Sequence, residues 1–373
     1  MMPVSARPIE QTARELSREN FARSPLLVYY EVTQACDLAC AHCRACAQTE
    51  PRPGELTTEQ SLRLIDQLTE FPSPPVLVFT GGDPLKRADI FELVEYATSL
   101  GLQVAITPSA TPLVTPRAIR RLRRAGISRL AVSMDGADAR THDAVRGVAG
   151  SFDRTLEILA DARQEGISTQ VNTTITPTNV DQIERMAELL AGQGIVMWSV
   201  FFLVPTGRAS NAPRLSADES EAAFERLWRQ SQHQPYAIKT TEAPHYRRFV
   251  IQQQLAKRSR RVPGARSDYK SRNTNDGKGV MFVSHAGEIY PSGFLPICCG
   301  MFPADHVVHV YQNSPIFRGL RDDNRLEGKC KVCEFRHICG GSRARAYAVT
   351  GNLFAEEPDC SYVPQALAVS REG

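Results

Sequence analysis

Apolar runs rich in β-branched or aromatic residues alternate with amphipathic stretches along most of the chain. The predicted strands are 26–33, 75–80, 103–107, 129–136, 168–176 and 196–204, and the predicted helices that follow them are 57–71, 88–101, 115–126, 151–166, 179–194 and 216–232. A seventh strand is predicted at 236–243, before a helix that begins at Pro244. Repeated strand–helix units imply parallel strands joined by right-handed crossovers. We therefore expect an α/β fold, an open partial (β/α)6 barrel, with its chemistry at the C-terminal ends of the strands.

The pattern changes near residue 258, which divides the chain into predicted regions. These are an N-terminal segment at 1–25, the barrel at 26–257, a basic linker at 258–279 and a small cysteine-rich domain at 280–373. The linker is polar and rich in Gly, Ser and Asn, which favours an exposed connection over a binding arm. The last region begins with a predicted hairpin turning at Ala286–Gly287 and is expected to need a metal cluster to hold its fold.

Composition excludes several function classes. Net charge is only +3, so no polyanion-binding surface and no nucleic-acid partner are predicted. The polar start is no secretory signal, and the most apolar run, 195–204, is too short to span a bilayer, so we expect a cytoplasmic protein without membrane contact. In that reducing compartment the ten cysteines are not expected to form disulfides. Four lie at 36–46 and six beyond 297, and such clustering indicates metal or iron–sulfur sites.

The first cysteine group follows the first predicted strand in the stretch "CDLACAHC". Cys36, Cys40 and Cys43 can hold one corner of a cuboidal four-iron cluster and leave one iron without a protein ligand, which is then free to bind a small molecule. A structural zinc site with Cys46 as fourth ligand is the alternative, because zinc prefers a sealed tetrahedral site. The spacing, with His42 before the last cysteine, resembles the radical S-adenosylmethionine (SAM) superfamily. The resemblance makes Cys36, Cys40 and Cys43 the catalytic cluster ligands, leaving Cys46 a bystander.

Further segments extend this resemblance and imply SAM contacts. "FTGGDP" at the end of the second strand is similar to the family's Gly-Gly-Glu motif, with Asp in place of Glu, and "SMDG", "RGVAGSFDR" and the fifth strand fall where the family has polar contacts. The third strand ends in "TPSA" where many relatives have Thr-Asn-Gly. The implied cofactor-binding residues are His42, Thr80, Gly81, Gly82, Asp83, Ser109, Ser133, Asp135, Arg146 and Asn172. A capping or turn role is the alternative for each single polar residue.

The second cysteine group combines short and long spacings. Its members are Cys330, Cys333, Cys339 and Cys360. Four thiolates can fully ligate one cluster, and the region resembles the SPASM/twitch extension of radical SAM enzymes. Ser292 and Ser342 stand where full SPASM domains have cysteines, which implies one auxiliary cluster in place of two. Zinc at these four cysteines is the competing metal, and the roles of Cys298 and Cys299 stay open.

The resemblance implies two [4Fe–4S] clusters, SAM, and an electron donor such as flavodoxin or ferredoxin. SAM is cleaved reductively to a 5′-deoxyadenosyl radical, which abstracts hydrogen from a substrate C–H bond. A tetrapyrrole or another carboxylate-bearing small molecule is the expected substrate. A peptide maturase with a separate recognition partner is one alternative, and a non-catalytic iron–sulfur electron-transfer or sensor protein is another. The candidate substrate contacts are Arg208, Glu242, His245 and Arg247.

Overall fold

The computed structural model describes residues 21–259 and 273–368, so most of the expected N-terminal segment and linker lies outside the described residues. The strands are β1 (Leu27–Glu31), β2 (Val76–Thr80), β3 (Val104–Ile106), β4 (Arg129–Ser133), β5 (Thr169–Ile175), β6 (Met197–Phe202), β7 (Ala237–Thr241), β8 (Val280–Val283), β9 (Glu288–Tyr290) and β10 (Gly300–Met301). The helices of the first 259 residues are α2 (Thr58–Thr69), α3 (Ile90–Ser99), α4 (Pro116–Arg124), α5 (Ala139–Arg146), α6 (Ser151–Gln164), α7 (Ile183–Ala191), α8 (Ala217–Ser231) and α9 (His245–Ser259). The later helices are α10 (Val307–Asn313), α11 (Pro315–Leu320), α12 (Gly328–Val332), α13 (Arg343–Thr350) and α14 (Gln365–Ala368), and short 3₁₀ turns occupy Pro84–Lys86, Val180–Gln182, Gly207–Ala209 and Asp323–Arg325.

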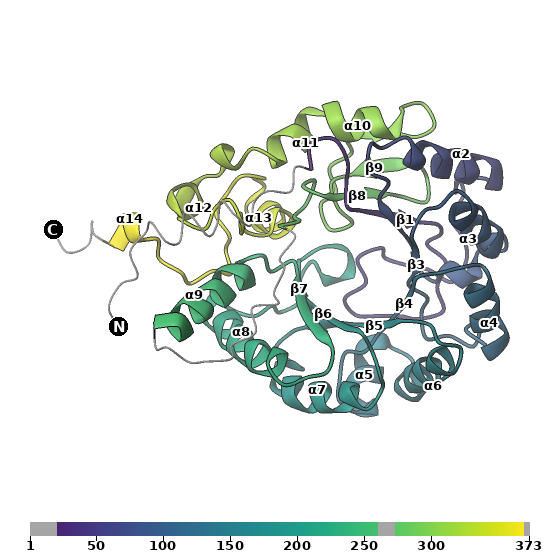
Figure 1. Cartoon of the computed structure of the whole chain (residues 1–373), viewed down its shortest axis with the longest axis horizontal. Helices are drawn as coiled ribbons and strands as arrows, with labels where there is room; N and C mark the ends of the chain where they lie inside the picture. The colour runs from purple at the N-terminus through teal and green to yellow at the C-terminus, as the bar shows by residue number, and fades with distance from the viewer. Residues whose placement is uncertain (1–20, 260–272, 369–373) are drawn as a thin grey trace.

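Strands β1 to β7 pair in parallel, in chain order, as one curved sheet with the helices outside it (Figure 1). This is the open (β/α) arrangement predicted from the alternating pattern, including the seventh strand. Local sequence determines where the elements begin: Thr57 forms a capping box with Gln60 at the start of α2. Helix α5 was not predicted, and it begins at the Asp138 cap and ends at Gly147, which has a φ of 71°.

Side chains along the barrel strands alternate between two environments. Leu130, Val132, Val171 and Trp198 point to the helices and are buried in the main core. Their neighbours point into the lumen, and many of these are polar and only half-buried. The alternation follows from the two-residue period of a strand. The core therefore lies between sheet and helices, and the lumen provides a polar interior reached from the strand ends.

The predicted hairpin at 280–293 extends the barrel's own sheet. β8 pairs in parallel with β1, and β9 then pairs antiparallel with β8. Gly287, with a φ of 89°, occupies the predicted turn, where an added Cβ would lie 2.1 Å from the Phe302 carbonyl oxygen. The cysteine-rich region thus continues the sheet of the barrel, which the sequence pattern did not indicate.

Helix α13 lies between the two ends of the curved sheet (Figure 1). The Ser342 hydroxyl donates to Glu242, just after β7, at 2.5 Å, and the backbone N–H of Ala344 donates to Asp276, just before β8, at 2.9 Å. These contacts join the C-terminal region to both sides of the opening. Within the described residues, no helix is long and apolar enough to span a membrane.

Candidate active site

The first cysteine group occupies the loop between β1 and α2. Cys36 and Cys40 are buried, Cys43 is half-buried, and all three pack with Leu38 and Ala47 in one small cluster. Each sulfur has one donor: Leu38 N at 3.4 Å for Cys36, Arg146 Nη1 at 3.7 Å for Cys40, and Ala47 N at 3.4 Å for Cys43. Such donors stabilise a thiolate once it has formed, although burial raises the pKa of the Cys36 thiol against their effect. The loop therefore presents three gathered sulfurs, each with a nearby donor.

Two glycines allow the end of β2 to lie directly against this loop. The N–H of Gly82 donates to the Thr33 carbonyl oxygen at 2.8 Å. A Cβ on Gly81 would lie 2.4 Å from Thr33 O, and one on Gly82 would lie 2.4 Å from Ala35 O. Any side chain here would push β2 away from the cysteine loop. The sequence predicted that both glycines contact SAM. The structure shows their contact with the backbone of the cysteine loop, and the SAM contact stays a prediction.

Asp83 is turned away from the lumen. Its carboxylate accepts hydrogen bonds from Thr111 Oγ1 at 2.7 Å, Leu85 N at 3.1 Å and Ser109 N at 3.4 Å. Burial raises the pKa of this carboxyl, against the opposing effect of those donors. The side chain thus fixes the loop after β3, and its predicted contact with SAM stays a prediction.

The remaining predicted SAM residues surround the cysteine loop. Ser109 Oγ lies 3.3 Å from Cys36 Sγ and donates to the Gly82 carbonyl oxygen at 3.0 Å. Ser109, in the "TPSA" stretch that differs from the family's usual Thr-Asn-Gly, therefore contacts the first cysteine group. Thr80, Ser133 and Asn172 lie on the lumen side near the strand ends and are half-buried.

A buried carboxylate links the fourth strand to the cysteine loop. Asp135 forms ion pairs with the Arg146 guanidinium and with His42 Nε2, the latter at 3.3 Å, and it accepts Thr174 N at 2.7 Å. Burial alone would raise the pKa of Asp135, but Arg146 and then His42 hold that pKa below its usual range. His42 Nδ1 has no hydrogen-bond partner among the described residues. This imidazole nitrogen is available to a ligand beside the sulfurs.

Two arginines that anchor the cysteine loop were not predicted in that role. The Arg208 guanidinium donates to the Cys40 carbonyl oxygen at 3.0 Å and to Ala47 O, and its backbone N–H donates to Cys43 O at 3.0 Å. Arg44 pairs with Glu31 at 2.8 Å and lies 4.6 Å from the centre of the Phe282 ring. Arg208 was expected to contact substrate. Two of its guanidinium N–H groups hold the loop backbone, which gives Arg208 a role in loop positioning, and the substrate contact stays a prediction.

Glu31 also links the first cysteine loop to the C-terminal region. His285, in the β8–β9 turn, lies 2.9 Å from Glu31 through Nδ1. Burial would raise the pKa of Glu31, but Arg44 and His285 lower it, so the carboxylate stays ionised. The first cysteine loop and the hairpin are therefore held by one charged group on β1.

The second cysteine group lines one pocket of about 330 Å³, open solvent included, at the end of α12. Backbone N–H groups face its sulfurs, with Glu357 N at 3.4 Å from Cys330 and Gly341 N at 3.5 Å from Cys339. Burial raises the pKa of Cys333 to about 12 and that of Cys339 well above its usual value, and the neighbouring thiols add to the second shift. Such thiols give up their protons readily only to a metal or cluster.

The other three predicted substrate residues contact protein groups in this region. His245 is buried against the second cysteine pocket, and burial lowers its pKa to about 3, so the imidazole is neutral. Glu242 accepts from Ser342, and burial, then the Asp276 carboxyl, raise its pKa to about 8. Arg247 donates to Ile338 O at 3.0 Å and to Thr274 O. We do not include these residues in a substrate site.

The bystander cysteines differ in exposure. Cys46 is exposed and has a φ of 48°, outside the cluster formed by the three buried or half-buried thiols. Cys298 is exposed and Cys299 half-buried, in the segment between β9 and β10. Neither lines the second cysteine pocket. These three thiols therefore lie apart from the two groups formed by the other seven cysteines.

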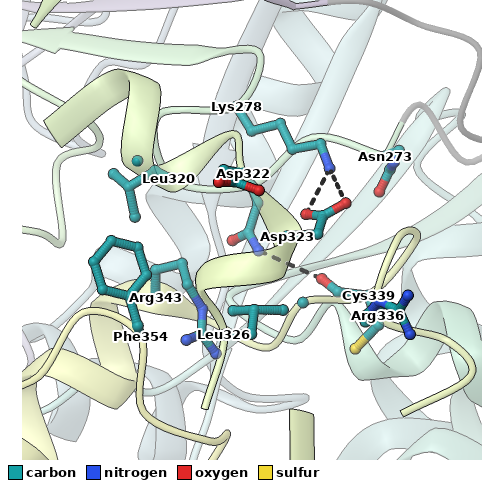
Figure 2. A pocket seen from close by; sticks show the side chains of 13 residues that line it. Asn273, Lys278, Leu320, Asp322, Asp323, Leu326, Arg336, Cys339, Arg343 and Phe354 are labelled. Carbon is teal, nitrogen blue, oxygen red and sulfur yellow. Dashed lines mark hydrogen bonds and ion pairs between the residues drawn. The ribbon is translucent and has the colours of Figure 1, made fainter. Parts of the chain in front are cut away.

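A further hollow of the C-terminal region lies on another side of Cys339 (Figure 2). Its cation Lys278 is paired with Asp323 at 3.1 Å, which also lies 3.1 Å from His337 Nδ1. Arg343 donates to the Leu353 and Ala355 carbonyl oxygens at 3.0 and 2.7 Å. Lys278, Asp323 and Arg343 thus have protein partners, although Arg343 Nη2 has no hydrogen-bond partner among the described residues.

Neither cysteine set is arranged around one point in the described part of the chain. Within 21–259 and 273–368, no three His, Cys, Asp or Glu side chains converge closely enough to hold one metal ion. One zinc ion needs all its sulfurs at about 2.3 Å from a single point. A cubane distributes cysteine ligands over separate irons.

Comparison with known proteins agrees with the site. Residues 30–190 match the model of the Radical SAM superfamily. The chain is 38% identical over 343 residues to the AdoMet-dependent heme synthase of Methanosarcina barkeri, covering 91% of this chain and 97% of that protein. It is 30% identical over 351 residues to the Fe-coproporphyrin III synthase of the same organism, covering 90% and 87%. Streptococcus suis SuiB, solved with its precursor peptide SuiA, shares the fold with a TM-score of 0.71 at 18% identity, over 95% of this chain and 80% of SuiB. The chain belongs to the radical SAM superfamily and is an enzyme of that family with a cysteine-rich, SPASM-like C-terminal region.

Proposed function

We propose that this enzyme tailors a side chain of a carboxylate-bearing tetrapyrrole by hydrogen-atom abstraction. The observation that carries the proposal is the gathering of three donor-stabilised thiols at the mouth of a polar lumen. The substrate class rests on the heme and coproporphyrin synthases to which the chain is similar over nine-tenths of its length. The structure of SuiB bound to its precursor peptide is only 18% identical to this chain, so it supports the fold alone. Peptide maturation is therefore the second candidate function.

Radical SAM enzymes use SAM and a [4Fe–4S] cluster, which together supply a 5′-deoxyadenosyl radical. We assign Cys36, Cys40 and Cys43 as the cluster ligands. Arg208 and Arg44 hold their loop in place, and Arg146 balances charge at Cys40. His42 Nδ1, Ser133 and Asn172 face the space in which SAM would lie and are its proposed contacts. The protein's task is to orient the target C–H bond and exclude water.

We further propose a second cluster on Cys330, Cys333, Cys339 and Cys360. Ser342 caps α13 and Ser292 accepts Phe294 N, so the two serines have structural contacts where a fuller extension would have ligands. Iron and sulfide analysis should give about eight of each per reconstituted chain. Replacing Cys36, Cys40 and Cys43 together by alanine should leave about half. If zinc is found at the second cysteine group, that group has a structural role and no redox role.

We place the enzyme in the cytoplasm, with flavodoxin or ferredoxin as its one-electron donor. The second cluster would pass an electron to or from the substrate. An enzyme with these parts should form 5′-deoxyadenosine under strong reduction, whereas a non-catalytic iron–sulfur protein would not. That reaction separates the two classes.

The decisive experiment uses iron coproporphyrin III deuterated on its propionate side chains. The reconstituted enzyme, SAM and reduced flavodoxin should transfer deuterium into 5′-deoxyadenosine. A parallel reaction with an unrelated short peptide should give only unlabelled, abortive product. Absence of SAM cleavage would contradict the enzyme assignment. SAM cleavage without transfer from this porphyrin or its iron-free form would contradict the substrate class.

A further inference from the structure

The lumen contains two cations that form no ion pair within the described part of the chain. Arg129 opens β4, and Lys239 lies in the middle of β7. Arg129 Nη1 lies 3.4 Å from Gln170 Oε1 and 3.9 Å from Met197 Sδ, which places the guanidinium inside the barrel beside β5 and β6. No carboxylate among the described residues forms an ion pair with either side chain, and Arg129 Nε is buried without a hydrogen-bond partner.

Strand pairing brings the two cations to neighbouring parts of the sheet: Lys239 pairs with Ser199 on β6, two residues from the Met197 that Arg129 contacts. Burial lowers the pKa of Lys239 to about 8, and the positive charges of Arg129 and Arg247 add to the shift. Burial also lowers the pKa of Arg129. The carboxyls nearest to the lumen are committed elsewhere: Glu31 to Arg44 and His285, and Glu242 to Ser342.

Uncompensated cations in a half-buried interior cost free energy, so their presence calls for an anion. We propose that Arg129 and Lys239 bind a carboxylate group of the substrate at the floor of the lumen. A guanidinium and an ammonium on opposing strands can contact the two oxygens of one carboxylate. The inference rests on the proposed function for its substrate class.

The position of Arg129 and Lys239 would orient a bound substrate relative to the cysteine loop. Lys239 precedes the last residue of β7, Thr241, by two positions, which is about 7 Å along a strand. The cysteine loop lies at the strand ends, on the side of β1 and β2. An acid side chain held at the floor would leave the rest of the substrate at the mouth, where hydrogen abstraction takes place. Neither Arg129 nor Lys239 was among the residues predicted to contact substrate, although Arg247, which was, lies close enough for its charge to act on Lys239.

The test is binding of coproporphyrin III and of its tetramethyl ester to the reconstituted enzyme, followed by porphyrin fluorescence. Arg129→Gln and Lys239→Gln should each weaken binding of the free acid by about 10- to 100-fold, the range expected for a hydrogen bond to a charged group. Binding of the ester should not change, and Lys239→Arg should retain most of the affinity. The control is Arg120→Gln on the outer face of α4, where the side chain is half exposed.

Two further measurements separate recognition from a structural role. SAM affinity and thermal stability of the apo variants should be unchanged or higher, since each substitution removes an unpaired charge. Loss of stability, or equal effects on acid and ester, would overturn the inference while leaving the proposed function intact.

A wild-type enzyme that binds neither porphyrin would contradict the tetrapyrrole assignment instead. The carboxylate site is then tested with glutarate, by following the ¹³C resonance of reductively methylated Lys239, assigned by its loss in Lys239→Arg. A shift that is absent in Arg129→Gln supports the site. No shift at any glutarate concentration overturns it.

Discussion

Arg345 is the buried link between the second cysteine group and the barrel, and its removal should be costly. The side chain is 1% exposed, and Nε lies 2.8 Å from Glu357 Oε1 and 3.1 Å from Asp359 Oδ2. It also donates to the carbonyl oxygens of Leu203 at 3.3 Å and Glu242 at 2.6 Å, after β6 and β7. Arg345→Met keeps the volume but leaves a buried carboxylate unpaired. Breaking a buried pair in this way costs about 3–5 kcal/mol.

A neighbouring arginine supplies the matched control for this prediction. Arg214 also pairs with Asp359, at 3.0 Å, but is 34% exposed. Arg214→Met should therefore cost only about 0.2–1 kcal/mol. Both variants are unfolded by urea and by heat, at equal cluster loading, with circular dichroism as the signal. Combining Arg345→Met with Glu357→Gln should recover part of the loss, because the stranded charge is gone. Equal losses for the two single variants would refute the reasoning.

Further changes test other parts of the structure. Cys46→Ala should keep both iron content and 5′-deoxyadenosine formation, because this exposed thiol lies outside the three-sulfur cluster; loss of iron would make it a ligand. Cys333→Ala should abolish product while some abortive SAM cleavage remains, as measured by chromatography of both products; normal turnover would exclude electron relay. Glu242→Gln should raise the melting temperature relative to wild type as pH increases from 6 to 9. The folded-state pKa of Glu242 is about 8, above its ordinary 4.5, so its contribution is full below pH 4.5 and is lost as pH rises through 8. A pH-independent difference would contradict this.

Local patterns predicted most of the elements of the barrel and the two groups of cysteines. The two-residue period of strands and the amphipathic helices reproduced the barrel order, and the cysteine spacings separated the two groups. Helix α5 was missed because it is short and carries few apolar residues. Its caps, Asp138 and Gly147, were the available signal.

Long-range contacts were beyond the reach of local patterns. Arg208 anchors Cys40 across 168 positions in the chain, and His285 meets Glu31 across 254. Nothing near Arg208 in the sequence distinguishes a loop anchor from a substrate contact. The pairing of β8 with β1, and the meeting of Arg129 with Lys239 in the lumen, likewise depend on how distant strands close.

The parallel pairing of β8 with β1 affects how this protein tolerates truncation. β1 sits in the interior of the sheet only because a strand from beyond residue 279 covers its outer side. A chain cut after α9 would present the backbone donors and acceptors of Leu27–Glu31 to solvent, on an apolar strand with few features that discourage pairing. Such a fragment should self-associate through this uncovered border. The C-terminal region therefore protects the edge of β1 from pairing with other chains, independently of any redox chemistry. We expect that it cannot be removed without exposing that edge.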